Sequence, residues 1–198
     1  IDFRRSKTMS DVIKKNFSDH LDVINKILAS DASSIKLLGE LLANCLEKKG
    51  TIFWCGNGGS ASDSQHIAAE LVGRFRNDRP ALKSIALTTD TSILTSVGND
   101  YGFDQIFSRQ LEALGSSGDI LVGISTSGHS KNILNAFKVA SALGITSIAL
   151  TGKDGGLAKE ISDHSIIVDS ESTARIQEAH ILIGHILCEL IEERLQFV

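Results

Sequence analysis

The chain has 198 residues, of which 42% are hydrophobic and 22% charged, and its formal net charge is −4. This composition excludes an intrinsically disordered chain, and a single proline and three scattered cysteines exclude proline-rich and disulfide-framework proteins. No run approaches the roughly 18–20 apolar residues of a membrane span, and no cluster of lysine and arginine indicates a nucleic-acid surface. We therefore expect one globular domain that binds neither membrane nor nucleic acid. Because the cysteines are typical of reduced, buried thiols, we expect it to be cytoplasmic.

The first residues differ in character from the rest of the chain. Residues 1–8 (IDFRRSKT) precede Met9, show no apolar periodicity and lack the apolar core of a signal peptide. We interpret residues 1–8 as a non-native leader and residues 9–198 as a single domain.

Two amphipathic helices are predicted between residues 10 and 49, where apolar residues recur at helical spacing. Lys48, Lys49 and Gly50 form a typical helix end. The first helix carries more apolar residues than an edge helix needs, which favours a subunit interface over packing within its own domain. We expect a helical hairpin at residues 10–49 that lies at an oligomer interface.

From Thr51 onward, short β-branched runs alternate with helical stretches. The predicted strands are 51–55, 84–87, 120–124, 145–150 and 165–168, and the predicted helices are 60–74, 103–114, 130–143, 156–162 and 173–195. Such alternation is typical of a parallel sheet covered on both faces. The predicted fold class is therefore α/β: a three-layer αβα sandwich, flavodoxin- or Rossmann-like, with a central five-stranded parallel sheet and an N-terminal helical hairpin.

Two loops that follow predicted strands are rich in glycine and hydroxyl side chains. Residues 55–62 read CGNGGSAS and residues 123–130 read GISTSGHS. Parallel sheets bind ligands at the carboxyl ends of their strands, and a glycine-rich loop before a helix favours an anion. Both loops suit a phosphate, or a phosphate with sugar hydroxyls. The loop at 97–102 (VGNDYG) is also polar, whereas residues 151–156 indicate a turn and a helix start.

Two other interpretations of these loops remain open. Gly56, Gly58 and Ala61 fit G-x-G-x-x-A, a loose dinucleotide fingerprint. A dinucleotide site also needs an acidic residue about 20 residues further on, but Asp90 lies about 30 residues beyond the loop. Ordinary glycine-serine turns explain one such loop better than two.

The predicted helix after the first loop carries His66 and Glu70. Their i, i+4 spacing places them on one face, about one turn apart. This arrangement suits two ligands of one metal ion or a pair for proton transfer, and the alternative is a solvent-facing pair.

The last predicted helix contains His185 within an almost continuous apolar stretch. A buried histidine needs a hydrogen-bond partner or a bound ligand. Both Gln177 and Glu178 lie on a suitable part of the helix, and spacing alone does not choose between them. His180 is expected to face elsewhere.

Several motifs together resemble one family. GNGGSAS, ISTSGHS and RIQEAHILIGH are similar to the sugar isomerase (SIS) domain family, and more narrowly to its phosphoheptose isomerases. AAELVGRFRNDRP, VGNDYGFDQIFSRQ and TGKDGG match the same group, so the resemblance extends from Met9 to the C-terminus. It departs at Ala174, where some members carry an aspartate.

The resemblance implies a homotetramer, one zinc ion per subunit and conversion of D-sedoheptulose 7-phosphate to D-glycero-D-manno-heptose 7-phosphate for lipopolysaccharide or capsule. The implied zinc ligands are His66, Glu70, Gln177 and His185. The implied substrate contacts are Ser125, Thr126, Ser127 and Ser130 for the phosphate, and Asn57, Gly58, Gly59, Glu70, Asn99, Asp100 and Gln177 for the sugar.

The expected reaction passes through an enediol, with Glu70 as the base and His185 as the acid. Glu70 would be less basic as a zinc ligand, so its two roles conflict. The alternative is a non-catalytic SIS protein that binds a sugar phosphate as a regulator, or as a scaffold for a replication initiator. Such a protein has no need for Glu70 and His185 together.

Overall fold

The computed structural model describes residues 8–197, so the predicted leader lies outside the described residues except for Thr8. Thr8 caps helix α1 (Met9–Ser30). Its hydroxyl accepts the N–H of Asp11 at 3.2 Å, and the Asp11 carboxylate accepts the N–H of Thr8 at 3.1 Å. This reciprocal capping box makes Thr8 part of the first helix.

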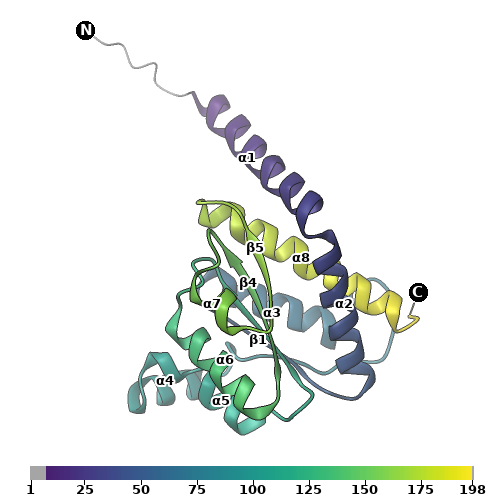
Figure 1. Ribbon diagram of the computed structural model, residues 1–198, viewed down its shortest axis with the longest axis vertical. Helices are drawn as coiled ribbons and strands as arrows, with labels where there is room; N and C mark the ends of the chain where they lie inside the picture. Colours follow the sequence, from purple (N-terminus) through teal and green to yellow (C-terminus); the bar gives the residue numbers. More distant parts are fainter. Residues whose placement is uncertain (1–7, 198) are drawn as a thin grey trace.

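Helices α1 and α2 (Ala32–Glu47) are joined by Asp31 alone. Figure 1 shows α2 continuing from α1 through a bend, with α1 projecting from the body of the molecule. The pair is thus more open than the expected hairpin, because reversal of a helix pair needs a connection of about 2–5 residues.

The five predicted strands are confirmed, with ends shifted by a residue or two. They are β1 (Ile52–Gly56), β2 (Ser84–Ala86), β3 (Ile120–Ser125), β4 (Thr146–Gly152) and β5 (His164–Val168). All pair in parallel, in the order β2-β1-β3-β4-β5. Because β1 and β3 are neighbouring parallel strands, the two glycine- and serine-rich loops that follow them lie side by side at the carboxyl ends of the strands.

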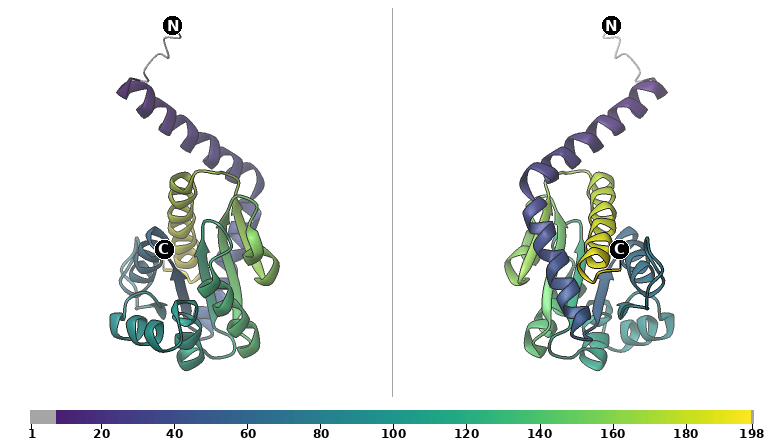
Figure 2. Two further views of the ribbon diagram at one scale, coloured as in Figure 1. Left: turned by 90° about the vertical axis from the view of Figure 1, so that its left-hand side faces the viewer. Right: turned by 90° about the vertical axis from the view of Figure 1, so that its right-hand side faces the viewer.

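Helices cover both faces of the sheet, as the predicted three-layer sandwich requires (Figure 2). Side chains of β1 alternate between two cores: Trp54 packs with helices α2, α3 (Gly59–Val72) and α8 (Thr173–Arg194), and Phe53 packs on the opposite face. That second core is built by α5 (Ser108–Leu114), α6 (Lys131–Leu143) and α7 (Gly156–Ile161). Because the strands are covered by helices on both faces, their sequences are nearly continuous apolar runs.

The region after β2 is more helical than predicted. Helix α4 (Thr91–Asp100) includes part of the expected loop at 97–102, and the helix expected at 103–114 divides into the 3-10 turn η1 (Phe103–Gln105) and α5. The Asp90 carboxylate accepts the N–H of Ile93 at 2.9 Å and caps α4. Asp90, the acidic residue that a dinucleotide site would need for the ribose, thus has a structural role as a helix cap.

The cysteine prediction is confirmed, because Cys45, Cys55 and Cys188 are free and buried. Among residues 8–197, no helix combines the length and apolar character needed to cross a membrane.

Candidate active site

The first loop is shaped by glycines that allow close approach. Gly58, with φ of +55°, precedes α3 in a backbone conformation that few other residues adopt. At Gly59, a Cβ would lie 2.5 Å from Nε2 of Gln177, so a larger residue would displace the end of this α8 side chain from the start of α3. The loop and the last helix therefore meet where α3 begins.

The second loop joins β3 to the N-terminus of α6. The hydroxyls of Ser125 and Ser130 lie 3.1 Å apart, and the Ser127 hydroxyl accepts the N–H of His129 at 3.2 Å. Ser125 is buried, whereas Thr126, Ser127 and Ser130 are half-buried. Hydroxyls together with the first N–H groups of a helix make this loop suitable for an anion.

A pair of asparagines links the two loops. Asn57 of the first loop and the buried Asn132 of α6 exchange two hydrogen bonds, of 3.0 and 2.8 Å. Asn132 is absent from the predicted site. Its place directly after the serine-rich loop is a signal that sequence reasoning could have used.

Asn99 and Asp100 lie at the end of α4, where their exposed side chains hydrogen-bond to each other at 2.8 Å. Among residues 8–197, no hydrogen bond connects these two side chains to either loop. The structure therefore does not bring them to the loops by direct contact.

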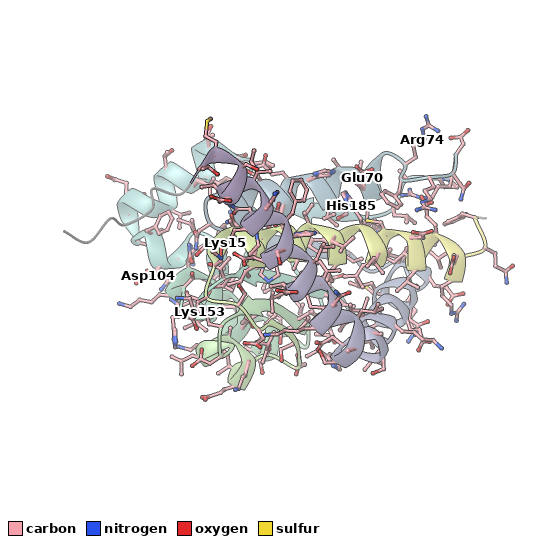
Figure 3. All side chains as sticks on the ribbon, turned by 90° about the horizontal axis from the view of Figure 1, so that it is seen from above. Lys15, Glu70, Arg74, Asp104, Lys153 and His185 are labelled. Carbon is pink, nitrogen blue, oxygen red and sulfur yellow. The ribbon has the colours of Figure 1, made fainter. Side chains whose placement is uncertain are left out.

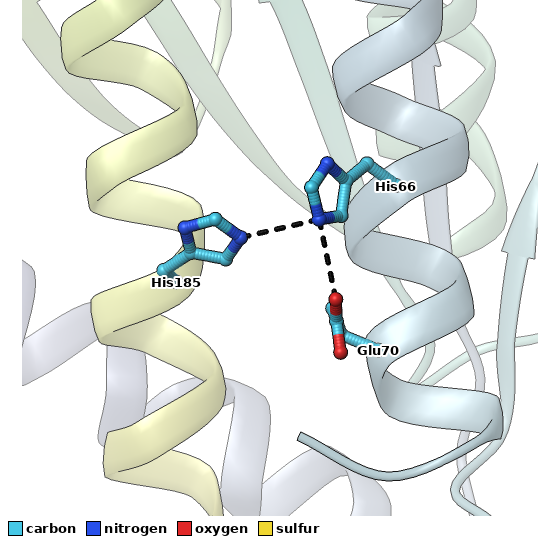
Figure 4. A group of neighbouring side chains, drawn as sticks. All are labelled: His66, Glu70 and His185. Atoms are coloured by element: carbon cyan, nitrogen blue, oxygen red, sulfur yellow. Dashed lines mark hydrogen bonds and ion pairs between the residues drawn. The ribbon is translucent and has the colours of Figure 1, made fainter. Parts of the chain in front are cut away.

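Three predicted residues converge between α3 and α8 (Figure 4). Nε2 of His66 lies 3.2 Å from a carboxylate oxygen of Glu70 and 3.3 Å from Nε2 of His185. The donor atoms all lie within 4.8 Å of one another. Residues 119 positions apart in the chain thus form one group, and Glu70 and His185 lie side by side in Figure 3.

The close approach of α3 and α8 makes this convergence possible. Gln177 of α8 contacts Gly59 of α3, and Gly184, further along α8, contacts Ile67, further along α3. The two helices therefore run in the same direction. A Cβ at Gly184 would lie 2.7 Å from the Ile67 side chain, so a larger residue would force either that side chain or the helix to shift.

The three-residue group could hold a metal ion. Two imidazole nitrogens and one carboxylate oxygen are a typical donor set for catalytic zinc, which leaves a fourth position open. Zn–N bonds of about 2.0–2.1 Å in a tetrahedron place ligand atoms roughly 3.3 Å apart. The distances of 3.2 and 3.3 Å between these donors fit that spacing.

Gln177 and Glu178 have different surroundings. Glu178 accepts hydrogen bonds from His20 of α1, at 2.7 Å, and from Arg175. The Gln177 side chain contacts Gly59. Gly59 precedes His66 by seven residues of α3, which is about 10 Å of helix rise. Its assignment as a fourth metal ligand stays a prediction, and its position supports contact with a ligand of the first loop.

Asp63 adds a carboxyl group one turn before His66. One of its oxygens is buried and has no hydrogen-bond partner among residues 8–197. Burial raises the pKa of Asp63, while the nearby His66 lowers it. The sequence pattern did not single out this residue.

His180 faces away from the site, as expected, and is buried beside the sheet. Its Nε2–H donates to the carbonyl oxygen of Thr151 at 2.9 Å. Burial lowers the pKa of His180 from 6.5 to about 4, although the bond to Thr151 acts in the opposite direction.

We expect His180 to make the protein less stable on acidification. An unfolded histidine gains its proton near pH 6.5 and the folded one only near pH 4, so stability present above pH 6.5 declines between these values. A shift of this size corresponds to about 3 kcal/mol. Urea titrations at pH 6.5 and 4.5 should show a smaller loss for His180→Gln than for the parent, and an equal loss would contradict this role.

Comparison with known proteins agrees with the fold. The family model described as the SIS domain matches residues 16–152. The parallel sheet, the two loops and this match define a SIS-domain protein.

The phosphoheptose isomerase of Campylobacter jejuni serotype O:6 is 52% identical over 187 residues, which cover 93% of this chain and 99% of that protein. The structure of the Neisseria gonorrhoeae phosphoheptose isomerase is 43% identical, with a TM-score of 0.88, and covers 94% of this chain and 100% of that one. The structure from Francisella tularensis has the same coverage, 39% identity and a TM-score of 0.92. This chain belongs to the phosphoheptose isomerase family, and the predicted resemblance is confirmed.

Proposed function

We propose that the protein converts D-sedoheptulose 7-phosphate to D-glycero-D-manno-heptose 7-phosphate in the cytoplasm, as the first step of heptose supply for lipopolysaccharide or capsule. The observation that carries the proposal is the convergence of Glu70 with His66 and His185, next to two loops suited to a sugar phosphate. A protein that only bound the phosphate would not need this group.

The phosphate binds at Ser125, Thr126, Ser127 and Ser130, where hydroxyls and the start of α6 favour an anion. Asn57, Gly58, Gly59 and Gln177 contact the sugar. Asn99 and Asp100 would contact the sugar only if α4 moved closer to the two loops. The chain of the sugar then extends along α3 towards Glu70, over about 10 Å of helix between Gly59 and His66.

Glu70 removes a proton from C1 of the open-chain ketose while His185 donates a proton to the oxygen on C2, which gives the enediol. The O1 proton then passes to His185, the C1 carbonyl forms, and Glu70 returns its proton to C2. Each residue ends in its starting state, so the cycle is balanced. Binding at the distant phosphate orients C1 and C2 for these transfers.

Incubating the purified protein with sedoheptulose 7-phosphate and following aldose formation tests this function. Turnover supports the isomerase. Binding of the sugar phosphate without turnover would contradict it and favour the non-catalytic SIS protein.

We also propose one zinc ion per subunit, held by His66, Glu70 and His185. A bound carboxylate is less basic and a bound imidazole nitrogen carries no proton, so Glu70 and His185 each leave the ion for the step in which they transfer a proton. When bound there, zinc supplies Lewis-acid polarisation of the sugar oxygens. Gln177 becomes a fourth ligand only if its amide leaves Gly59.

Removal of zinc with a chelator should abolish most of the turnover, and added zinc should restore it. Elemental analysis should find one zinc per chain in the active protein and none after chelation. Full activity in zinc-free protein would contradict a catalytic ion.

We propose that α1 packs against other subunits of a homotetramer. Its apolar side chains Ile13, Phe17, Leu21 and Leu28 are each more than half exposed. Between α1, α2 and α8 lies an apolar cavity of about 350 Å³. Exposed apolar residues on this scale are typical of a subunit interface.

Phe17→Lys should convert the tetramer into smaller species, because it places a charge in the apolar contact. Light scattering after size-exclusion chromatography measures the mass. Leu157→Lys on α7, which is also an exposed apolar position, should leave the mass unchanged. A parent protein that is monomeric at micromolar concentration would contradict the interface.

A further inference from the structure

The segment from Gly73 to Lys83, which links α3 to β2, has no regular secondary structure but is firmly attached to α8. It contains the motif GRFRNDRP, to which neither the spacing of the sequence nor the proposed reaction gives a role. Its attachment lies close to the three-residue group.

Glu192 of α8 holds the backbone of this segment. Its carboxylate accepts the N–H groups of Phe75 at 3.2 Å, Arg76 at 3.1 Å and Asn77 at 3.3 Å. It also accepts Nε–H of Arg79 at 2.9 Å. The Glu192 side chain is only 2% exposed, so a charge is held away from water by four donors.

Arg79 completes the attachment from the other side. Its guanidinium is fully buried and donates to the carbonyl oxygens of Glu70 at 2.9 Å and Leu71 at 2.8 Å, with a longer bond to Gly73 and another to Pro80. Carbonyls in the last turn of a helix lack intrahelical partners, and a positive charge is favourable there. The pair therefore joins the end of α3, at Glu70 itself, to α8.

The held segment places Phe75 against His185. Their ring centroids are 5.5 Å apart with an interplanar angle of 19°, so the rings are stacked. His66 meets the same imidazole at 71°, with centroids 4.9 Å apart. Rotation about the last side-chain torsion of histidine is broad, and a stacked ring restricts it.

We infer that the buried Arg79–Glu192 pair is a positioning device: it holds Phe75 on His185, and Phe75 sets the orientation in which His185 meets His66 and Glu70. The inference rests on the proposed function, in which His185 moves the proton. None of these three residues touches the reacting atoms, so they are positioning residues.

The ring of Phe75 is tested with Phe75→Leu and Phe75→Tyr. Phe75→Leu should lower kcat 10–100-fold with little change in KM, and should weaken zinc binding by the zinc-free protein by a similar factor, as expected for loss of a group that orients a ligating histidine. Phe75→Tyr keeps the ring and should retain both values. Competition with a chromogenic chelator measures the affinity for zinc.

The ion pair is tested with Glu192→Gln, which keeps the size of the side chain, and with Arg79→Lys, which keeps the positive charge but loses the planar guanidinium. Folded variants, checked by circular dichroism, should show the same fall in kcat and in zinc affinity as Phe75→Leu. Arg109→Met, which removes an exposed ion pair with Glu112 on α5, should change neither.

Folded Phe75→Leu with parental kcat and zinc affinity would overturn the inference while leaving the proposed function intact. If the parent chain has no isomerase activity and binds no zinc, the proposed function fails. Crystal structures of the parent and of Phe75→Leu then test the positioning role of Phe75 independently of activity. A rotated His185 ring in Phe75→Leu supports the positioning role, and an unchanged ring overturns it.

Discussion

Glu70→Gln should abolish isomerisation, with kcat reduced about 10³-fold or more, because the amide cannot take the C1 proton. The side chain keeps its size and its place one turn after His66 on α3. The serine-rich loop after β3 is untouched, so sugar-phosphate binding should remain within a few-fold of the parent.

Three measurements separate the roles of Glu70. Aldose formation gives kcat, equilibrium dialysis gives binding, and deuterium incorporation from heavy water reports proton removal from the sugar. Loss of incorporation with retained binding, in variant protein in which elemental analysis still finds one zinc per chain, supports Glu70 as the base. Glu112→Gln, a matched change of an exposed carboxylate on α5, should behave as the parent. Turnover of Glu70→Gln within tenfold of the parent would contradict the assignment.

Most of the fold could be predicted because its signals are local. Apolar runs such as 120–124 and the helical spacing of 130–143 depend only on neighbouring residues. Parallel topology then brings the carboxyl ends of β1 and β3 together, which accounts for the adjacency of the two loops. Two features were not predicted. The bend at Asp31 depends on the length of the connection between α1 and α2, and helix α4 depends on its cap at Asp90.

The partners of α8 could not be predicted from spacing alone. Gln177 and Glu178 differ by one residue, which is about 100° around a helix. That rotation turns Glu178 towards His20 of α1 and Gln177 towards Gly59. The choice depends on which element packs on each side of α8.

The positioning segment was missed for a related reason. Glu192 meets Phe75 across 117 residues of chain, in a stretch without periodicity. Arg79 and Glu192 are each indistinguishable in sequence from exposed charges, and only their burial between α3 and α8 reveals them.

Glu192→Ala should lower the free energy of unfolding by about 3–5 kcal/mol, since removal of one partner leaves a buried charge on Arg79. Three backbone N–H groups lose their acceptor at the same time. Glu193→Ala, the exposed neighbour on α8, is the matched control and should change stability by less than about 0.5 kcal/mol. Urea titrations at one fixed protein concentration measure both, because subunit association also contributes.

The pH dependence of this difference identifies its cause. Burial by itself raises the pKa of Glu192, but the bonds from the Arg76 N–H, from Arg79 and from the adjacent N–H groups outweigh burial and leave the pKa below its usual value. A lowered pKa in the folded state means that the carboxylate stabilises the fold above the unfolded value of 4.5, and that this contribution is lost as pH falls through the folded pKa. The gap between parent and Glu192→Ala should therefore be widest at neutral pH and narrow below pH 4.5. A gap that stays constant to pH 3 would show that packing, rather than the charge of Glu192, supplies the stability.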